Sequence, residues 1–119
     1  MEKSTVKKYD LESRTFQFSK KVISYVDQLP KRITMTEIGR QLVRAAGSVG
    51  ANYIEANEAL SKKDFLLRIK ICRKEAKEAR YWSALSEPSE EKQDEKTELM
   101  GEATELMKIF ASIIRRTTI

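Results

Sequence analysis

The chain has 119 residues, of which 40% are apolar and 34% are charged, and its net charge is +5. This length and balance fit one domain over residues 1–119 and exclude a largely disordered chain or two separate cores. The longest apolar run, residues 109–114, is far shorter than the roughly 18 residues of a membrane-spanning helix. Since no apolar signal segment is visible and the single Cys72 has no internal partner, we expect a cytoplasmic protein.

The sequence contains no histidine. This absence removes the Ser-His-Asp triad, the Cys-His pair and every zinc or di-iron site that uses histidine. We therefore expect no enzyme, no catalytic residue, no metal site and no cofactor.

Positive charge is concentrated in two segments. Residues 1–32 carry +8 and −4, and residues 62–86 carry +8 and −3, whereas residues 33–61 and 87–119 are net negative. We interpret residues 1–10 as a basic N-terminal tail.

The first helix is predicted at about 11–29, because apolar residues recur at spacings of three and four until Pro30 stops the helix. A second helix is predicted at about 35–60. Thr34 is its expected N-cap, with Glu37 completing a capping box, and its apolar seam runs to Leu60.

Ser61 is a further N-cap signal, so a third helix is predicted at about 62–86, ending before Pro88. Ser89 is expected to cap a fourth helix at about 90–116, with acids near its start and Arg115 and Arg116 at its end. Four amphipathic helices with short turns predict an all-α protein, an antiparallel up-down-up-down four-helix bundle.

Two glycines inside the second helix, Gly47 and Gly50, each cost roughly 1 kcal/mol relative to alanine. They lie among small residues, which favours close approach of a neighbouring helix. A phosphate-binding loop is disfavoured, because no strand precedes the glycines.

A basic stripe follows the third helix at spacings of three and four. Such a stripe is typical of a protein that binds nucleic-acid phosphates, although a solvated helix face gives the same pattern. Glu75 and Glu78 are placed to neutralise part of it, and Arg68 extends it. The candidate nucleic-acid-binding residues are Lys62, Lys63, Lys70, Arg73, Lys74, Lys77 and Arg80.

A polar stripe on the second helix is expected to form hydrogen bonds with the third helix or with a neighbouring subunit, or to serve as a binding surface. Four carboxylates of the two helices are expected to pair with Arg44 or Arg40, since the metal-binding pattern of di-iron bundles is absent: Glu55, Glu58, Glu75 and Glu78. The residues of this expected network or interface are Arg44, Ser48, Asn52, Glu55, Glu75 and Glu78.

Three further side chains lie at the end or on the inner side of the third helix. Tyr81 and Trp82 adjoin the basic stripe, where aromatic rings can stack on unpaired bases, but the spacing of Trp82 favours the core or a subunit interface. Cys72 is expected to be a buried apolar residue.

Residues 41–56, QLVRAAGSVGANYIEA, followed by SKKDF at 61–65 and the pair Glu75 and Glu78, resemble the proteins encoded in intervening sequences of bacterial 23S ribosomal RNA genes. The resemblance extends from Leu11 to about Ile114. Ala56 stands where many relatives have glycine.

This resemblance implies a homopentamer of four-helix bundles. The chain is also similar to the accessory variability proteins of diversity-generating retroelements, which bind nucleic acid and associate with a reverse transcriptase. The implied function is a non-enzymatic, homo-oligomeric accessory protein that binds RNA or DNA. The alternative is a scaffold that docks a protein such as a reverse transcriptase, and no membrane partner is expected.

Overall fold

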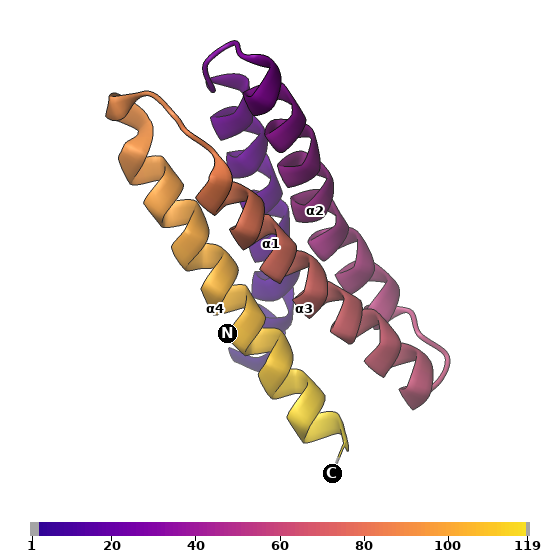
Figure 1. The fold of residues 1–119 in the computed structure, drawn as a ribbon. Helices are drawn as coiled ribbons and strands as arrows, with labels where there is room; N and C mark the ends of the chain where they lie inside the picture. The colour runs from indigo at the N-terminus through magenta and orange to yellow at the C-terminus, as the bar shows by residue number, and fades with distance from the viewer. Residues whose placement is uncertain (1–2, 119) are drawn as a thin grey trace.

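The computed structural model describes the backbone of residues 3–118 and the side chains of residues 11–118. Four long helices follow one another: α1 (Lys3–Asp27), α2 (Ile33–Asn57), α3 (Lys62–Leu85) and α4 (Gln93–Thr118), with a short 3-10 helix, η1 (Glu90–Lys92), before α4. They pack into a bundle, and residues 3–118 contain no strand (Figure 1). The all-helical prediction is confirmed.

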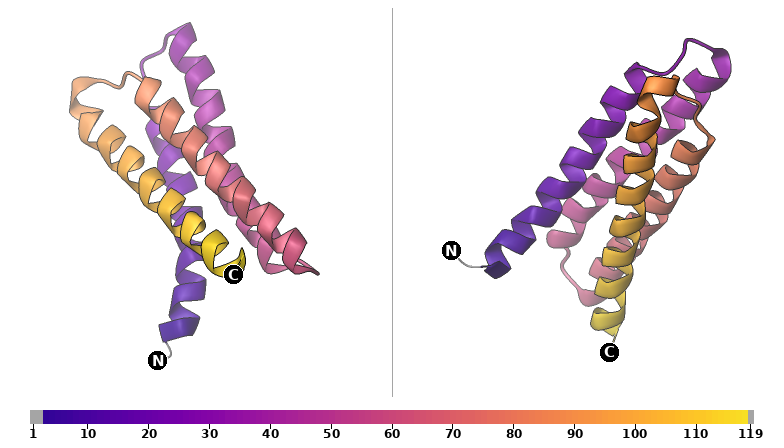
Figure 2. Two further views of the ribbon diagram at one scale, coloured as in Figure 1. Left: turned by 60° about the horizontal axis from the view of Figure 1, so that its bottom comes forward. Right: turned by 90° about the vertical axis from the view of Figure 1, so that its left-hand side faces the viewer.

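The neighbour relations are unequal around the bundle. α3 lies between α2 and α4 and packs extensively on both, whereas α1 packs mainly on α2 and touches α4 at few positions. Figure 2 shows the N-terminal part of α1 diverging from the other helices. The side between α1 and α4 is therefore the open side of the bundle. Within residues 3–118, no helix is both long and apolar enough to cross a membrane.

Small residues of α2 allow α1 to approach closely. A Cβ added to Gly50 would lie 3.3 Å from Thr15 Oγ1 and 3.8 Å from the Thr15 backbone, and one added to Gly39 would lie 2.7 Å from Val26 Cγ1. At Gly47 the nearest atom, Ser19 Oγ, is 3.9 Å away. The packing explanation is thus confirmed at Gly50, while Gly47 leaves room for a small side chain.

All four helices contribute to one core. Phe18 of α1, Leu42 of α2, Ile69 of α3 and Phe110 of α4 are each almost fully buried. Burying one such side chain contributes ~1.5–3 kcal/mol relative to leaving it in water. Along each helix, buried apolar residues recur every three or four positions, so one face of the helix is apolar. These helices are stable mainly because that face packs against the other helices.

Two expected N-caps are wrong. α2 begins at Ile33 with Arg32 as its N-cap and without a side-chain cap, so Thr34 and Glu37 form no capping box. Ser89 likewise makes no capping hydrogen bond and precedes η1 rather than α4. In both cases the chain enters the helix with an extended residue whose side chain does not reach the free amides.

The Ser61 cap is confirmed, because its Oγ accepts a hydrogen bond from the Asp64 amide at 3.0 Å. Leu60, expected at the end of the second apolar seam, is instead 98% exposed, since α2 already ends at Asn57. At the other end of the chain, α1 extends back to Lys3 and includes the backbone of residues 3–10, which the sequence suggests as a tail.

A buried polar group anchors the connection between α3 and α4. Ser86 Oγ donates to the Ser83 carbonyl at 2.6 Å, and the Tyr25 hydroxyl lies 2.6 Å from the same Oγ. Because Ser86 has one hydroxyl proton, Tyr25 is the donor in the second bond. Lys96 Nζ also donates to the Ser86 carbonyl at 2.9 Å. These bonds tie α1, α3 and α4 together at one end of the bundle.

Candidate nucleic-acid interface

Four lysines share the outward face of α3. At 3.6 residues per turn, Lys63, Lys70, Lys74 and Lys77 fall within a sector of about 60°. All four side chains are exposed, and the buried residues of α3 occupy the opposite side of the helix. We call these four lysines the basic face.

Three more candidate residues lie beside the basic face. Lys62, Arg73 and Arg80 are exposed and lie ~60–80° around the helix from Lys70. The structure therefore brings all seven candidate cations to the outer surface of one helix. Arg68 does not belong with them, because it is partly buried on the α2 side.

Most of these cations lack a nearby carboxylate. Within residues 11–118, the only ion pair of the seven is Lys74 Nζ with Glu75 Oε2 at 3.4 Å. The acids of α3, which are Asp64, Glu75 and Glu78, all lie outside the 60° sector. The expected neutralisation by Glu78 is absent among these residues, so the basic face keeps most of its charge.

The polar stripe of α2 is split by the structure. Asn52 Oδ1 accepts from Arg68 Nη1 at 2.9 Å, and Asn52 Nδ2 donates to the carbonyl and the Oγ of Ser48 at 2.9 and 3.0 Å. The predicted hydrogen bond to the third helix thus exists at Asn52. Arg44 and Glu55 are exposed instead and take no part in it.

The expected pairing of carboxylates with Arg44 or Arg40 is wrong. Arg40 Nε lies 4.0 Å from Glu37, and Glu75 pairs with Lys74. Among residues 11–118, Glu55, Glu58 and Glu78 have no ion-pair partner within 4.0 Å. Exposed ion pairs contribute only about 0–1 kcal/mol, so these carboxylates gain little from a partner on another helix.

The aromatic pair at the end of α3 is divided between surface and core. Tyr81 is 58% exposed and lies in the same sector as the basic face, whereas Trp82 is partly buried against the core. Their ring centroids are 5.1 Å apart at an interplanar angle of 74°. The prediction that Trp82 packs inward is confirmed.

Cys72 is fully buried, as expected, and its thiol donates to the Val49 carbonyl at 3.4 Å. Desolvation by burial raises the pKa of the thiol to about 12. A thiol held neutral and shielded is a poor nucleophile at neutral pH.

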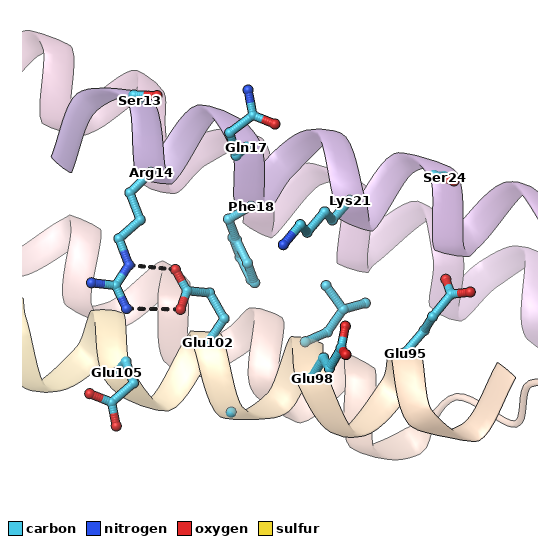
Figure 3. A pocket seen from close by; sticks show the side chains of 12 residues that line it. Ser13, Arg14, Gln17, Phe18, Lys21, Ser24, Glu95, Glu98, Glu102 and Glu105 are labelled. Carbon is cyan, nitrogen blue, oxygen red and sulfur yellow. Dashed lines mark hydrogen bonds and ion pairs between the residues drawn. The ribbon is translucent and has the colours of Figure 1, made fainter. Parts of the chain in front are cut away.

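A groove that the sequence does not predict lies between α1 and α4. Its volume is about 740 Å³, and the buried side chains of Phe18 and Leu99 line it. Figure 3 shows Phe18 extending from α1 towards α4. Arg14 of α1 crosses it and binds Glu102 of α4 through two hydrogen bonds of 2.6 and 2.9 Å. The available signal is a row of glutamates at spacings of three and four on the fourth helix: Glu95, Glu98, Glu102 and Glu105.

Most charges along the groove are paired. Besides Arg14 and Glu102, Lys92 pairs with Glu95 at 3.0 Å and Lys108 with Glu105 at 3.6 Å. Among residues 11–118, no three His, Cys, Asp or Glu side chains are placed to hold a metal ion. The groove therefore offers neither a strong field nor a set of ligands.

The fold and the basic face define a small four-helix protein with one cation-rich outer surface. The chain belongs to the 23S rRNA-intervening sequence protein family, whose model matches residues 7–112. This confirms the family resemblance.

One solved structure is similar over most of its length. It is a protein with unknown function from the S23 ribosomal protein family of Bacteroides thetaiotaomicron VPI-5482. The two chains are 26% identical, with a TM-score of 0.74 over 87% of this chain and 96% of that chain. No curated protein matches the sequence.

Proposed function

We propose that this chain is a non-enzymatic accessory protein that binds the phosphate backbone of RNA or DNA through α3, without a cofactor. The observation that carries the proposal is the exposed basic face, whose Lys63, Lys70 and Lys77 have no ion-pair partner within residues 11–118. Cations without protein partners are free to replace counterions at phosphates, which provides most of the affinity in binding that is independent of sequence.

We further propose that the chain forms an up-down-up-down antiparallel bundle that assembles into a homopentameric ring in the cytoplasm. Exposed apolar side chains of α1 and α2, namely Phe16, Ile23 and Ile54, supply surface for such contacts. A ring repeats the basic face in every subunit. Weak phosphate contacts then add through avidity, so one long nucleic acid binds more tightly than a short one.

The test is a salt series with labelled structured RNA and matched DNA. Reversing three charges, with Lys70→Glu, Lys74→Glu and Lys77→Glu, removes three phosphate contacts. At about 0.1 M salt this lowers affinity by ~100-fold, because each contact contributes a slope of roughly 0.7–0.9 in log affinity against log salt. Circular dichroism should stay helical, since these side chains are exposed.

The matched control reverses three exposed cations elsewhere: Lys20→Glu, Lys31→Glu and Arg40→Glu. It changes net charge by the same amount and should retain most of the affinity. An equal loss in both variants would show that only net charge matters. Unchanged affinity in the α3 variant would refute the assignment of the site.

The alternative function is a scaffold that docks a partner protein, such as a reverse transcriptase, without touching nucleic acid. The same exposed Phe16, Ile23 and Ile54 favour it. A pull-down after nuclease treatment distinguishes the two. A protein recovered by the wild type but lost with Phe16→Ser and Ile54→Ser supports the scaffold, provided that sedimentation shows an unchanged oligomer.

A further inference from the structure

We propose that the basic face and Tyr81 together form a site for single-stranded nucleic acid, in which an unpaired base stacks on the Tyr81 ring. This inference rests on the proposed function and narrows its ligand class. Its basis is the position of Tyr81, an exposed aromatic side chain that does not pack in the core.

Tyr81 continues the row of lysines along the outside of α3. It follows Lys77 by four residues and Lys74 by seven, so all three lie on one side of the helix. The side chain is 58% exposed. An aromatic ring next to cations is the combination that binds unpaired bases: the cations hold phosphates and the ring stacks.

Trp82 holds the Tyr81 ring in place. The two rings meet edge to face, with centroids 5.1 Å apart and planes at 74°, and Trp82 is itself packed against the core. A side chain that is braced in this way loses less conformational entropy when a ligand binds. Tyr81 is therefore better prepared for stacking than a freely rotating surface tyrosine.

The length of the site fits a short single strand. Lys63 and Tyr81, the two ends of the site, are 81 − 63 = 18 positions apart, which is ~27 Å along the helix at about 1.5 Å per residue. Stacked nucleotides rise by ~3.4 Å each along one strand, so about eight of them cover this distance. This is within the usual range of ~4–16 nucleotides for single-strand sites.

A duplex would contact the lysines of this site but would make little use of Tyr81. Its phosphates can reach the lysines, but its bases are stacked on one another, so only the outer faces of the two terminal pairs are open to a tyrosine. The site as built therefore favours unpaired segments, including loops and strand ends. Recognition depends on the availability of a base and little on which base it is.

The experiment compares a labelled 12-nucleotide RNA single strand with the blunt duplex of the same sequence, using the full-length wild type, Tyr81→Ala and Tyr81→Phe. Tyr81→Ala should weaken single-strand binding ~5- to 150-fold and change duplex binding much less, since a duplex offers a face for stacking only at its two ends. Tyr81→Phe keeps the ring and should bind like the wild type. The control is Ile33→Ala, which removes another exposed apolar side chain, outside α3.

A second readout is the fluorescence of Trp82, the only tryptophan in the chain. Binding of the single strand should change it in the wild type, and binding of the duplex should change it much less. If Tyr81→Ala binds the single strand as the wild type does, or loses both ligands equally, the inference is wrong while phosphate binding by α3 stands. If the wild type binds neither ligand at low salt, the proposed function itself fails.

Discussion

The outer face of α3 and the groove between α1 and α4 are both rich in charge, but they use it differently. Along the groove, Glu95, Glu102 and Glu105 each have a cation within 4.0 Å. On α3, Lys70 and Lys77 have no carboxylate within that distance among residues 11–118. One region has most of its charges paired within the protein, and the other leaves most of them available for a ligand.

The number of charges alone therefore does not identify a binding surface. Of the paired charges at the groove, Arg14 and Glu102 connect α1 to α4, whereas Lys92 with Glu95 and Lys108 with Glu105 are local pairs, and the field of such close pairs largely cancels beyond a Debye length. Unpaired cations on one face produce a field that reaches an approaching polyanion. Variants of the two regions should therefore affect different properties: stability at the groove and binding at α3.

The largest effect is expected from Phe18→Ala, in the lining of the groove. The side chain is 1% exposed, so its loss leaves a cavity and lowers the free energy of unfolding by ~3–5 kcal/mol. Urea denaturation measures this loss. Affinity for RNA should be unchanged wherever the variant remains folded. A decrease in the free energy of unfolding of less than about 1 kcal/mol would mean that α1 moves to fill the cavity left by the Phe18 ring.

The stability of the protein should decrease at alkaline pH because of Cys72, which is buried on the inner side of α3. Burial raises the pKa of Cys72 to about 12 from 9.0, so the thiol ionises more readily in the unfolded chain. The contribution of Cys72 to stability is complete below pH ~9 and is lost as pH rises towards 12, with a slope of up to about 1.4 kcal/mol per pH unit.

Denaturation curves of the wild type and Cys72→Ala between pH 8 and pH ~11 measure this dependence. Lysines and tyrosines titrate in both proteins, so the difference between the two slopes isolates the thiol. Parallel curves would contradict burial of an un-ionised Cys72.

The sequence predicts the helices well where the physical signal is local and repeated. The apolar period places Phe18, Leu42, Ile69 and Phe110 in the core because a helix can bury only one face. It fails at Leu60, where the period continues past the end of the helix. Thr34 fails for a related reason: several residues can start a helix, and packing selects among them.

The candidate site was predictable in part for the same reason. Exposure of the lysines on α3 follows from spacing alone, since they lie opposite the apolar seam. Whether they are paired does not follow, because that depends on the positions of carboxylates around the helix and on its neighbours. The groove could not be predicted, because it arises from the divergence of α1 from α4, a property of tertiary packing.

A smaller effect is expected from the ion pair across the groove. Arg14 and Glu102 are about one-third exposed, with two hydrogen bonds, so water screens part of their attraction. A double-mutant cycle with Arg14→Ala and Glu102→Ala should give a coupling energy of about 1 kcal/mol or less. RNA affinity should not change in any of the variants. A coupling of several kcal/mol would mean that this pair, rather than the core, holds α1 in place.

Lys77→Ala is expected to change stability least. It should nevertheless weaken binding to nucleic acid measurably. The side chain is exposed and has no ion-pair partner among residues 11–118, so the free energy of unfolding should stay within about 0.5 kcal/mol of the wild type. Removing one phosphate contact should lower the slope of log affinity against log salt by roughly 0.7 for a single strand. A lower affinity with an unchanged slope would mean that Lys77 acts through packing or through a neighbouring subunit, and the distinction between the two charged regions would then lose its physical basis.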